Sequence, residues 1–296
     1  MRVADQQMYG TLLGNLQRSR LQILTSQEQI SSQKRVTNPA DDPSAFGQIV
    51  LDKSALSQTT QWIRNINFGT ARVDAADHAL GQVQNLIARV RELTVQASSD
   101  TTSAEGRQSI AKEVRQLQRQ LVQLGNTEVA GQAIFGGTKT DVQPFTITSG
   151  DTVAYQGNSE TQSIAVGENQ TVQILVPGSS IFTGSTINMF DSLRGLLTAL
   201  ESDNRSGIQA GLGNLDLATA QISDAQGTVG TLANRLQVTH DALDTATLTI
   251  TKSISDNQDA DLATAITQLR LQEVAVQAAS QTFTKIFDTS LINYLR

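Results

Sequence analysis

The sequence of 296 residues contains no cysteine, only four prolines and few aromatic side chains, which make up 4% of the chain. Without cysteine no disulfide can form, so stability has to come from packing or from assembly with other chains. The scarcity of aromatic residues argues against a thick globular core, because these side chains supply much of the buried area in large cores. The length allows two or three domains, or one elongated body.

Basic tracts and long apolar runs are absent as well. The formal net charge is −6, and no segment concentrates Lys and Arg as a phosphate backbone would require, so we expect no nucleic-acid partner. No apolar run approaches the roughly 18 residues of a membrane span, and residues 1–10 lack the apolar stretch of a secretory signal. We therefore expect a soluble protein without membrane insertion, whose export would not involve a cleaved signal.

Helical patterns fill most of the chain. Asp42 followed by Pro43 predicts a helix start, since a carboxylate can cap free N–H groups and proline fits the first helical position. Beyond this start, apolar and small residues recur at spacings of three and four, and Gly125 with Asn126 suits a helix end. Such seams predict a helical bundle, and they cover residues 49–97, 110–124 and 222–250.

Residues 138–187 have a different pattern. Short β-branched runs alternate with turn-forming pairs such as Gly157-Asn158 and Pro177-Gly178, which predicts a small inserted β domain. Helical spacing resumes at residues 190–200. The predicted runs of strand are residues 146–148, 153–155, 164–166 and 172–176.

Both ends of the chain are amphipathic and follow heptad steps, so we expect the two terminal helices to pair, with the insertion at the far end of a hairpin-shaped molecule. The predicted fold is mainly α, an elongated helical bundle with paired terminal helices and a small inserted β domain. The predicted domains are a terminal coiled coil of residues 1–42 and 257–296, a bundle of residues 43–137 and 188–256, and the β insertion of residues 138–187.

Candidates for catalysis, cofactor binding or metal binding are weak. His78 and His240 each lie beside an aspartate, but no second histidine and no cysteine stands at ligand spacing, so both are interpreted as ordinary histidines. The acidic stretch from Asp256 to Asp261 lacks the glycine and glutamate of a calcium loop and is interpreted as a solvated linker. The glycine-rich segments 136–138 and 211–213 are interpreted as turns. We predict no enzyme, no cofactor and no metal.

One segment resembles a known family. Residues 31–45, SSQKRVTNPADDPSA, resemble the N-terminal signature of the bacterial flagellin family, in which a serine-rich turn, an arginine and paired aspartates follow the terminal helix. The flanking Pro39 and Pro43 resemble the hook-filament junction members of that family, and Gln33 stands where many relatives carry glycine. Further segments that resemble the family are residues 135–145, 155–158, 253–263 and 269–279.

The resemblance implies a structural role in the bacterial flagellum, at the hook-filament junction outside the cell, after export by the flagellar type III apparatus. The terminal helices would form an inner tube, the bundle a middle layer and the β insertion an outer one. The implied partners are hook-associated protein 1, flagellin, copies of the chain itself and an export chaperone. The residues assigned to assembly contacts are Leu13, Leu16, Ile23, Ile30, Leu262, Leu269, Val276, Phe283 and Ile286.

Three residues of the signature have two interpretations. Arg35, Asp41 and Asp42 would form a lock between layers or between neighbouring subunits, or Asp42 would simply cap a helix beside a solvated arginine; the two do not exclude each other. Two other functions also stay open, a short flagellin that forms filaments by itself and a secreted binding module or hydrolase on residues 138–187. Pro39 and Pro43 argue against the short flagellin. The absence of a recognisable nucleophile and base argues against the secreted module or hydrolase.

Overall fold

The computed structural model describes residues 2–184 and 186–294, without the side chains of residues 2–6, 8, 9, 149, 283 and 285–294. Internal contacts divide the chain into two compact units. The terminal unit contains Met1–Gln58 and Ala246–Arg296, and the bundle unit contains Thr59–Thr245. The finer division into three domains stays a prediction.

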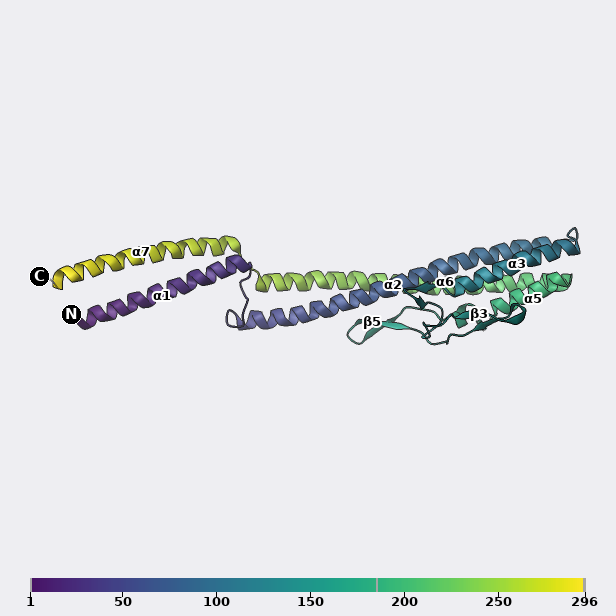
Figure 1. Cartoon of the computed structure of the whole chain (residues 1–296), viewed down its shortest axis with the longest axis horizontal. Coiled ribbons are helices and arrows are strands. Elements are labelled where there is room, and N and C mark those ends of the chain that lie inside the picture. Colours follow the sequence, from purple (N-terminus) through teal and green to yellow (C-terminus); the bar gives the residue numbers. More distant parts are fainter. Residues whose placement is uncertain (1, 185, 295–296) are drawn as a thin grey trace. The chain divides into compact units, whose positions relative to one another are not determined.

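In the terminal unit, helices α1 (Arg2–Ser32) and α7 (Leu262–Tyr294) lie side by side and run antiparallel (Figure 1, purple and yellow). The predicted pairing of the chain's ends is thereby confirmed. Helix α2 (Pro43–Ser98) begins in this unit and α6 (Arg205–Gln258) ends in it. Among the described residues of this unit, Val36, Ala45 and Ile49 form a small buried apolar cluster.

The start of α2 at Pro43 is the one that the sequence predicts. Asp42 accepts the backbone N–H of Ala45 through Oδ1 at 3.0 Å, and its carbonyl accepts the N–H of Phe46 at 2.9 Å. The carbonyl bond is the first regular bond of the helix, and the side-chain bond satisfies the N–H of Ala45, which an uncapped helix end would leave free.

The bundle unit packs α2 and α6 with two shorter helices, α3 (Ala104–Gly125) and α5 (Met189–Glu201) (Figure 1). Ser103 caps α3 at its start, and α3 ends at the predicted Gly125. The apolar seams predicted from the sequence supply most of the core, including Leu80, Val83 and Leu121, which are almost completely buried. The predicted helical bundle is confirmed.

The β region consists of three separate hairpins without a common sheet among the described residues. Strands β3 (Phe145–Ile147) and β4 (Val153–Tyr155) form one hairpin through the turn η1 (Ser149–Asp151), and β5 (Ser163–Gly167) pairs with β6 (Gln170–Gln173). A third hairpin, β1 (Glu128–Val129) with β2 (Gln132–Ala133), is not among the predicted strands. Its strands of two residues each are too short to show an alternating pattern in the sequence. The turn between them is formed by Ala130 and Gly131, which both adopt positive φ angles.

An aromatic cluster joins the β region to the helices. Phe145 of β3 lies 5.1 Å, between ring centroids, from Tyr155, Phe182 and Phe190, and Phe135 contacts Phe182 edge to face at 5.3 Å. Most of the aromatic side chains of this unit therefore pack together in one cluster. The short helix α4 (Gly178–Ile181) packs beside this cluster, where a Cβ on Gly178 would lie 2.9 Å from the Phe145 ring.

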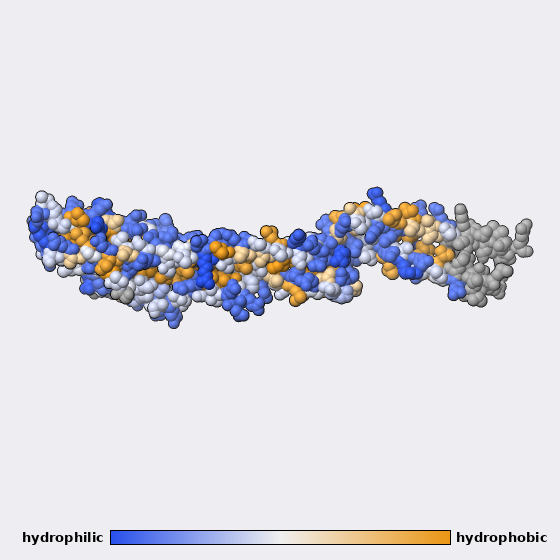
Figure 2. Space-filling model, turned by 180° about the vertical axis from the view of Figure 1, so that it is seen from behind, coloured by the Kyte–Doolittle hydropathy of each residue, from blue (hydrophilic) through white to orange (hydrophobic). Residues whose placement is uncertain are grey.

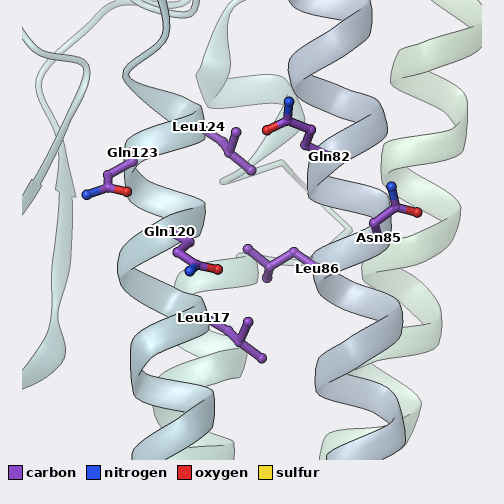
Figure 3. A pocket seen from close by; sticks show the side chains of 7 residues that line it. All are labelled: Gln82, Asn85, Leu86, Leu117, Gln120, Gln123 and Leu124. Atoms are coloured by element: carbon purple, nitrogen blue, oxygen red, sulfur yellow. The ribbon is translucent and has the colours of Figure 1, made fainter.

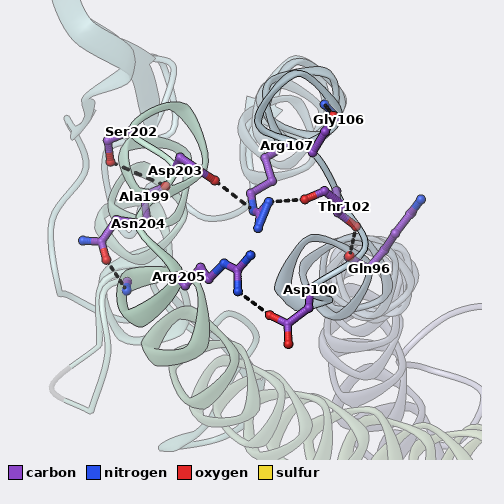
Figure 4. Close-up of polar contacts among 12 residues, drawn as sticks. Gln96, Asp100, Thr102, Gly106, Arg107, Ala199, Ser202, Asp203, Asn204 and Arg205 are labelled. Carbon is purple, nitrogen blue, oxygen red and sulfur yellow. Dashed lines mark hydrogen bonds and ion pairs between the residues drawn. The ribbon is translucent and has the colours of Figure 1, made fainter.

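Ion pairs join the turns at the end of the bundle. Arg107 of α3 is buried, forms an ion pair with Asp203 at 3.1 Å between Nε and Oδ1, and donates to the carbonyl of Thr102 (Figure 4). Arg205 pairs with Asp100 beside it. These contacts hold the turn between α2 and α3 against the turn between α5 and α6.

The interpretation of residues 211–213 as a turn is wrong. Gly211 and Gly213 lie inside α6. A Cβ on Gly211 would lie 2.9 Å from Cδ1 of Leu196, so the glycine allows α5 to approach α6 closely. Gly137, in contrast, adopts a φ of 69° in the predicted turn.

Candidate functional site: the terminal helices and their connectors

Helices α1 and α7 pack against each other along one seam, a line of buried and half-buried residues on each helix. Residues that are buried or half-buried recur at alternating steps of four and three on both helices, as in an antiparallel coiled coil. On α1 they are Leu12, Leu16, Ser19, Ile23, Ser26 and Ile30, and on α7 they are Ala265, Leu269, Gln272, Val276 and Ala279.

The structure divides the residues assigned to assembly contacts into two groups. Five of them lie in the seam and pack within the chain: Leu16, Ile23, Ile30, Leu269 and Val276. Leu13 and Leu262 lie outside the seam and are 53% and 37% exposed. The side chains of Phe283 and Ile286 lie outside the described part of the structure. Contact with neighbouring subunits stays a prediction for all nine.

Further apolar side chains of the pair face solvent, and the sequence reasoning did not single them out as contacts. They are mostly exposed, and the members are Leu21, Leu24, Ile266, Leu271 and Val274. Figure 2 shows hydrophobic side chains at the surface of this unit, next to the grey residues. A pair of helices has only one shared seam, so any apolar residue beyond it must be exposed until another chain covers it.

The connector between α1 and α2 contains Arg35 and Asp42. The Arg35 guanidinium donates to Asp42 Oδ2 at 3.2 Å and to the carbonyl of Asn257 at 2.8 Å. Asp42 therefore both caps α2 and binds Arg35, and Arg35 ties this connector to the end of α6. The backbone N–H of Ala45, followed by the Arg35 side chain, lowers the pKa of Asp42.

Asp41 has a different role from Asp42. Its Oδ2 accepts the backbone N–H groups of Asn38 and Thr37, each at 2.9 Å, and these bonds lower its pKa. It therefore closes the proline-containing turn instead of bridging segments. Gln33, before this turn, adopts a φ of 58°, a left-handed conformation that glycine adopts at lower cost.

The connector before α7 is more ordered than a solvated linker. Asp261 accepts the backbone N–H groups of Ala263 and Thr264 at 3.0 and 3.2 Å and so caps α7. Hydrogen bonds from the Thr264 side chain and backbone lower the pKa of Asp261. The signal was available in the sequence, since an aspartate directly precedes the apolar periodic segment.

No group of three metal-binding side chains gathers in the described residues. His78 contacts Gln82, and His240 pairs with Asp244 at 3.3 Å, one helical turn away, rather than with the adjacent Asp241. In the described part of the chain, no helix is apolar enough over a sufficient length to cross a bilayer.

A groove of about 510 Å³ lies between α2 and α3 (Figure 3). Its lining carries no charged side chain and no nucleophile, so it offers no acid, base or covalent chemistry. The lining residues are three leucines and four amides: Leu86, Leu117, Leu124, Gln82, Asn85, Gln120 and Gln123.

Known proteins resemble the chain along its length. The model of the bacterial flagellin N-terminal helical region matches residues 3–140, and that of the C-terminal helical region matches residues 212–295. The flagellar hook-associated protein 3 of Escherichia coli (strain K12) is 29% identical, with 98% of each chain covered.

Solved structures share the fold. A putative flagellar hook-associated protein from Vibrio parahaemolyticus matches with a TM-score of 0.68 at 20% identity, over 74% of this chain and all of that one. The flagellar junction protein FlgL from Legionella pneumophila matches with a TM-score of 0.60 at 16% identity, over 72% of this chain and all of that one.

Proposed function

Because the chain belongs to the bacterial flagellin family, whose members are structural components of the flagellum, we propose that it forms the junction between hook and filament. In this role it adapts hook-associated protein 1 to the first flagellin subunits. The similarity to hook-associated protein 3 over nearly the whole of both chains supports this member of the family rather than a filament-forming flagellin.

One observation carries the proposal. The terminal pair has a single narrow seam and leaves apolar side chains such as Leu24, Leu271 and Val274 at least 60% exposed. Contiguous exposed apolar residues mark protein contacts, and copies joined by one repeated heterologous contact form a ring or tube. Copies of the chain, hook-associated protein 1 and flagellin would cover these residues.

The proposed role is structural and not enzymatic. The protein acts as a structural link between hook and filament, outside the cell. It reaches this place by export through the flagellar type III apparatus, and an export chaperone binds it before export. In this role the ion pair of Arg35 with Asp42 holds the connector after α1 to the start of α2.

The test combines a deletion with two matched variants. Deleting the gene should leave cells with hooks that release flagellin into the medium, and the parent gene should restore filaments. Leu271→Asp with Val274→Asp places two charges on the exposed face of α7 and should leave bare hooks. The control, Gln268→Asp with Gln277→Asp, adds the same charge at exposed polar positions and should retain filaments.

Electron microscopy of cells and measurement of secreted flagellin provide the readout. Filaments on the deletion strain, or normal filaments with the Leu271 and Val274 variant, would contradict the proposal. Elongation of filament seeds by the purified protein alone would identify a short flagellin instead.

A further inference from the structure

The β5–β6 hairpin of the bundle unit leaves the outer edge of strand β6 unpaired. The N–H of Ile174 donates to the carbonyl of Gln162 at 2.9 Å, and bonded pairs alternate along an antiparallel ladder. The backbone N–H and carbonyl groups of Thr171 and Gln173 therefore point away from β5. Among the described residues, no group forms a hydrogen bond with them. This edge can accept a further strand.

The opposite edge of the hairpin is closed, and the hairpin is fixed to α2. Asn65 of α2 donates to the carbonyl of Ala165 at 2.9 Å, on the outer edge of β5. A Cβ on Gly69 of the same helix would lie 2.8 Å from Cδ1 of Ile164, so the hairpin packs closely on α2. Asn126 bonds to the backbone of β3 in a similar way. The free edge of β6 is therefore a fixed part of the surface.

A groove of about 480 Å³ lies between β6 and helix α6. Arg235 and Thr239 line it from α6, and the buried Val166 and Val172 line it from the hairpin. The carbonyl of Arg235 accepts the hydroxyl of Thr239 at 2.7 Å, but the guanidinium has no partner in the described part of the chain. No acidic side chain lines the groove. It therefore suits an extended segment that carries a carboxylate.

Residues 141–143 of the chain have the chemistry that this groove requires. Asp141 is exposed, and Val142 beside it is 40% exposed. None of the three residues forms a hydrogen bond or an ion pair within the described structure. Gln143 precedes Pro144, and a following proline disfavours the helical conformation and favours an extended one.

The spacing of side chains on the two surfaces agrees. In an extended segment Asp141 and Gln143 lie on one face, about 6.8 Å apart. Arg235 and Thr239 are one helical turn apart, about 6 Å along α6. The carboxylate of Asp141 can therefore meet Arg235 while the amide of Gln143 meets Thr239. The residue between them then lies opposite Thr171, whose backbone groups are free.

We propose that residues 141–143 of one copy of the chain add as a short strand to β6 of a neighbouring copy, in the groove beside α6. Within one chain the segment precedes β3, which lies farther along the bundle than the β5–β6 hairpin (Figure 1). Each copy thus offers one segment and one groove, and such a heterologous contact can repeat around a ring.

The contact rests on the proposed function, which brings copies side by side in the flagellum. Two backbone hydrogen bonds and one ion pair make a small interface, well below the area that holds two free proteins together. It should therefore form only where other contacts already keep the copies adjacent. The test has to be made in assembled flagella.

Engineered disulfides report the contact, because the chain has no cysteine of its own. Val142→Cys with Thr171→Cys places two thiols opposite each other across the proposed contact. This variant replaces the parent gene in the deletion strain, the flagella are oxidised and purified, and the chain is detected by immunoblot after a non-reducing gel. Each copy carries both thiols, so oxidation should link successive copies and give a ladder of multimers.

Val142→Cys with Ser163→Cys is the matched control. Ser163 is exposed on the same face of the same hairpin, but it belongs to β5, one strand farther from the proposed segment. The crosslinked fraction should be about tenfold lower than with Thr171→Cys. Oxidation of the purified chain with cysteines at 142 and 171, at high dilution, should give neither multimers nor an internal disulfide.

Charge reversal tests the ion pair in the background with cysteines at 142 and 171. Arg235→Glu should lower the crosslinked fraction about tenfold, because it sets two carboxylates against each other. Adding Asp141→Arg should restore the fraction. Arg119→Glu makes the same change at an exposed arginine of α3 and should leave the fraction unchanged.

Four results would overturn the proposal: equal crosslinking at Thr171 and Ser163, an internal disulfide in the dilute chain, no multimers in flagella that contain the chain, or no response to charge reversal. Reduced samples show whether the chain is present in the flagella, and electron microscopy shows the filaments. Filaments restored without the ladder would refute this contact and leave the proposed function intact. Absence of the chain from purified flagella would contradict both.

Discussion

Asn126, at the end of α3, bonds to a strand as a neighbouring strand would. Its side-chain amide donates to the carbonyl of Phe145 at 2.7 Å, and its side-chain oxygen accepts the N–H of Phe145 at 2.8 Å. Phe145 is 1% exposed, so water cannot replace either bond without rearrangement. Asn126→Ala should therefore destabilise the bundle unit by removing both partners at once.

The magnitude follows from the two orphaned groups. A buried backbone N–H or carbonyl left without a partner costs about 1–3 kcal/mol, so the expected loss in free energy of unfolding is about 2–5 kcal/mol. Urea unfolding followed by the fluorescence of Trp62, the only tryptophan, measures it in this unit. With a slope of about 2 kcal/mol per molar urea, the midpoint should fall by about 1–2.5 M.

Gln123→Ala is the control, since Gln123 is an exposed amide one turn earlier on the same helix. It should change the free energy of unfolding by less than about 0.5 kcal/mol. Hydrogen exchange of the Phe145 amide should accelerate only in the Asn126 variant. A loss below about 0.5 kcal/mol for Asn126→Ala would refute the reasoning.

Other changes have equally direct expectations. Gly137→Ala should lower the free energy of unfolding in urea by about 2–4 kcal/mol, because φ is 69° and a Cβ would lie 2.1 Å from Oδ1 of Asn158. Gly131→Ala, with a φ of 75° but open space around the Cβ, should cost only about 1 kcal/mol. Equal losses in the two variants would contradict this reasoning. Arg107→Met should cost about 1–3 kcal/mol by the same assay, whereas Arg205→Met, at an exposed pair, should cost under about 1 kcal/mol. The pKa of Asp42 is lowered on folding, so the ionised carboxylate stabilises the folded state above roughly pH 4, and this stabilisation declines as the pH falls through the folded pKa. Asp42→Asn should therefore reduce the loss of stability on acidification. An unchanged profile of stability against pH would argue against this role of Asp42.

Local sequence signals were sufficient for much of the fold. Asp42 with Pro43 marks the start of α2, and strand β4 occupies the predicted residues 153–155. These features depend on capping, turn chemistry and periodicity within a few residues. Where such a signal was short, as at the β1–β2 hairpin, or ambiguous, as at Gly211, the sequence reasoning missed the element or misread it.

The candidate site was predicted only in part. Heptad spacing identified the two terminal helices, but it did not separate the seam from the exposed face. Leu12 and Leu13 are adjacent and chemically identical, yet the first is half-buried and the second is 53% exposed. The difference depends on where α7 lies, and its residues are more than 240 positions away in the sequence.

Buried charges show the same limit. Arg72 is fully buried in α2 because its guanidinium donates to Gln132 and to the carbonyl of Ala133, at the β1–β2 hairpin. Nothing near Arg72 in the sequence indicates this burial. A buried arginine is stable only where distant backbone or side-chain oxygens converge on it, which no local pattern reports.

The sequence by itself therefore determined the helices, their apolar faces, the connector turn and the family, because each is encoded by residues close together in the chain. Tertiary structure decided which leucines pack within the chain, which arginines are buried, and that residues 33–36 meet residues 257–260. The physical reason is that hydrogen-bond partners and burial across the fold depend on segments brought together only by folding, whereas capping and periodicity act within a few residues.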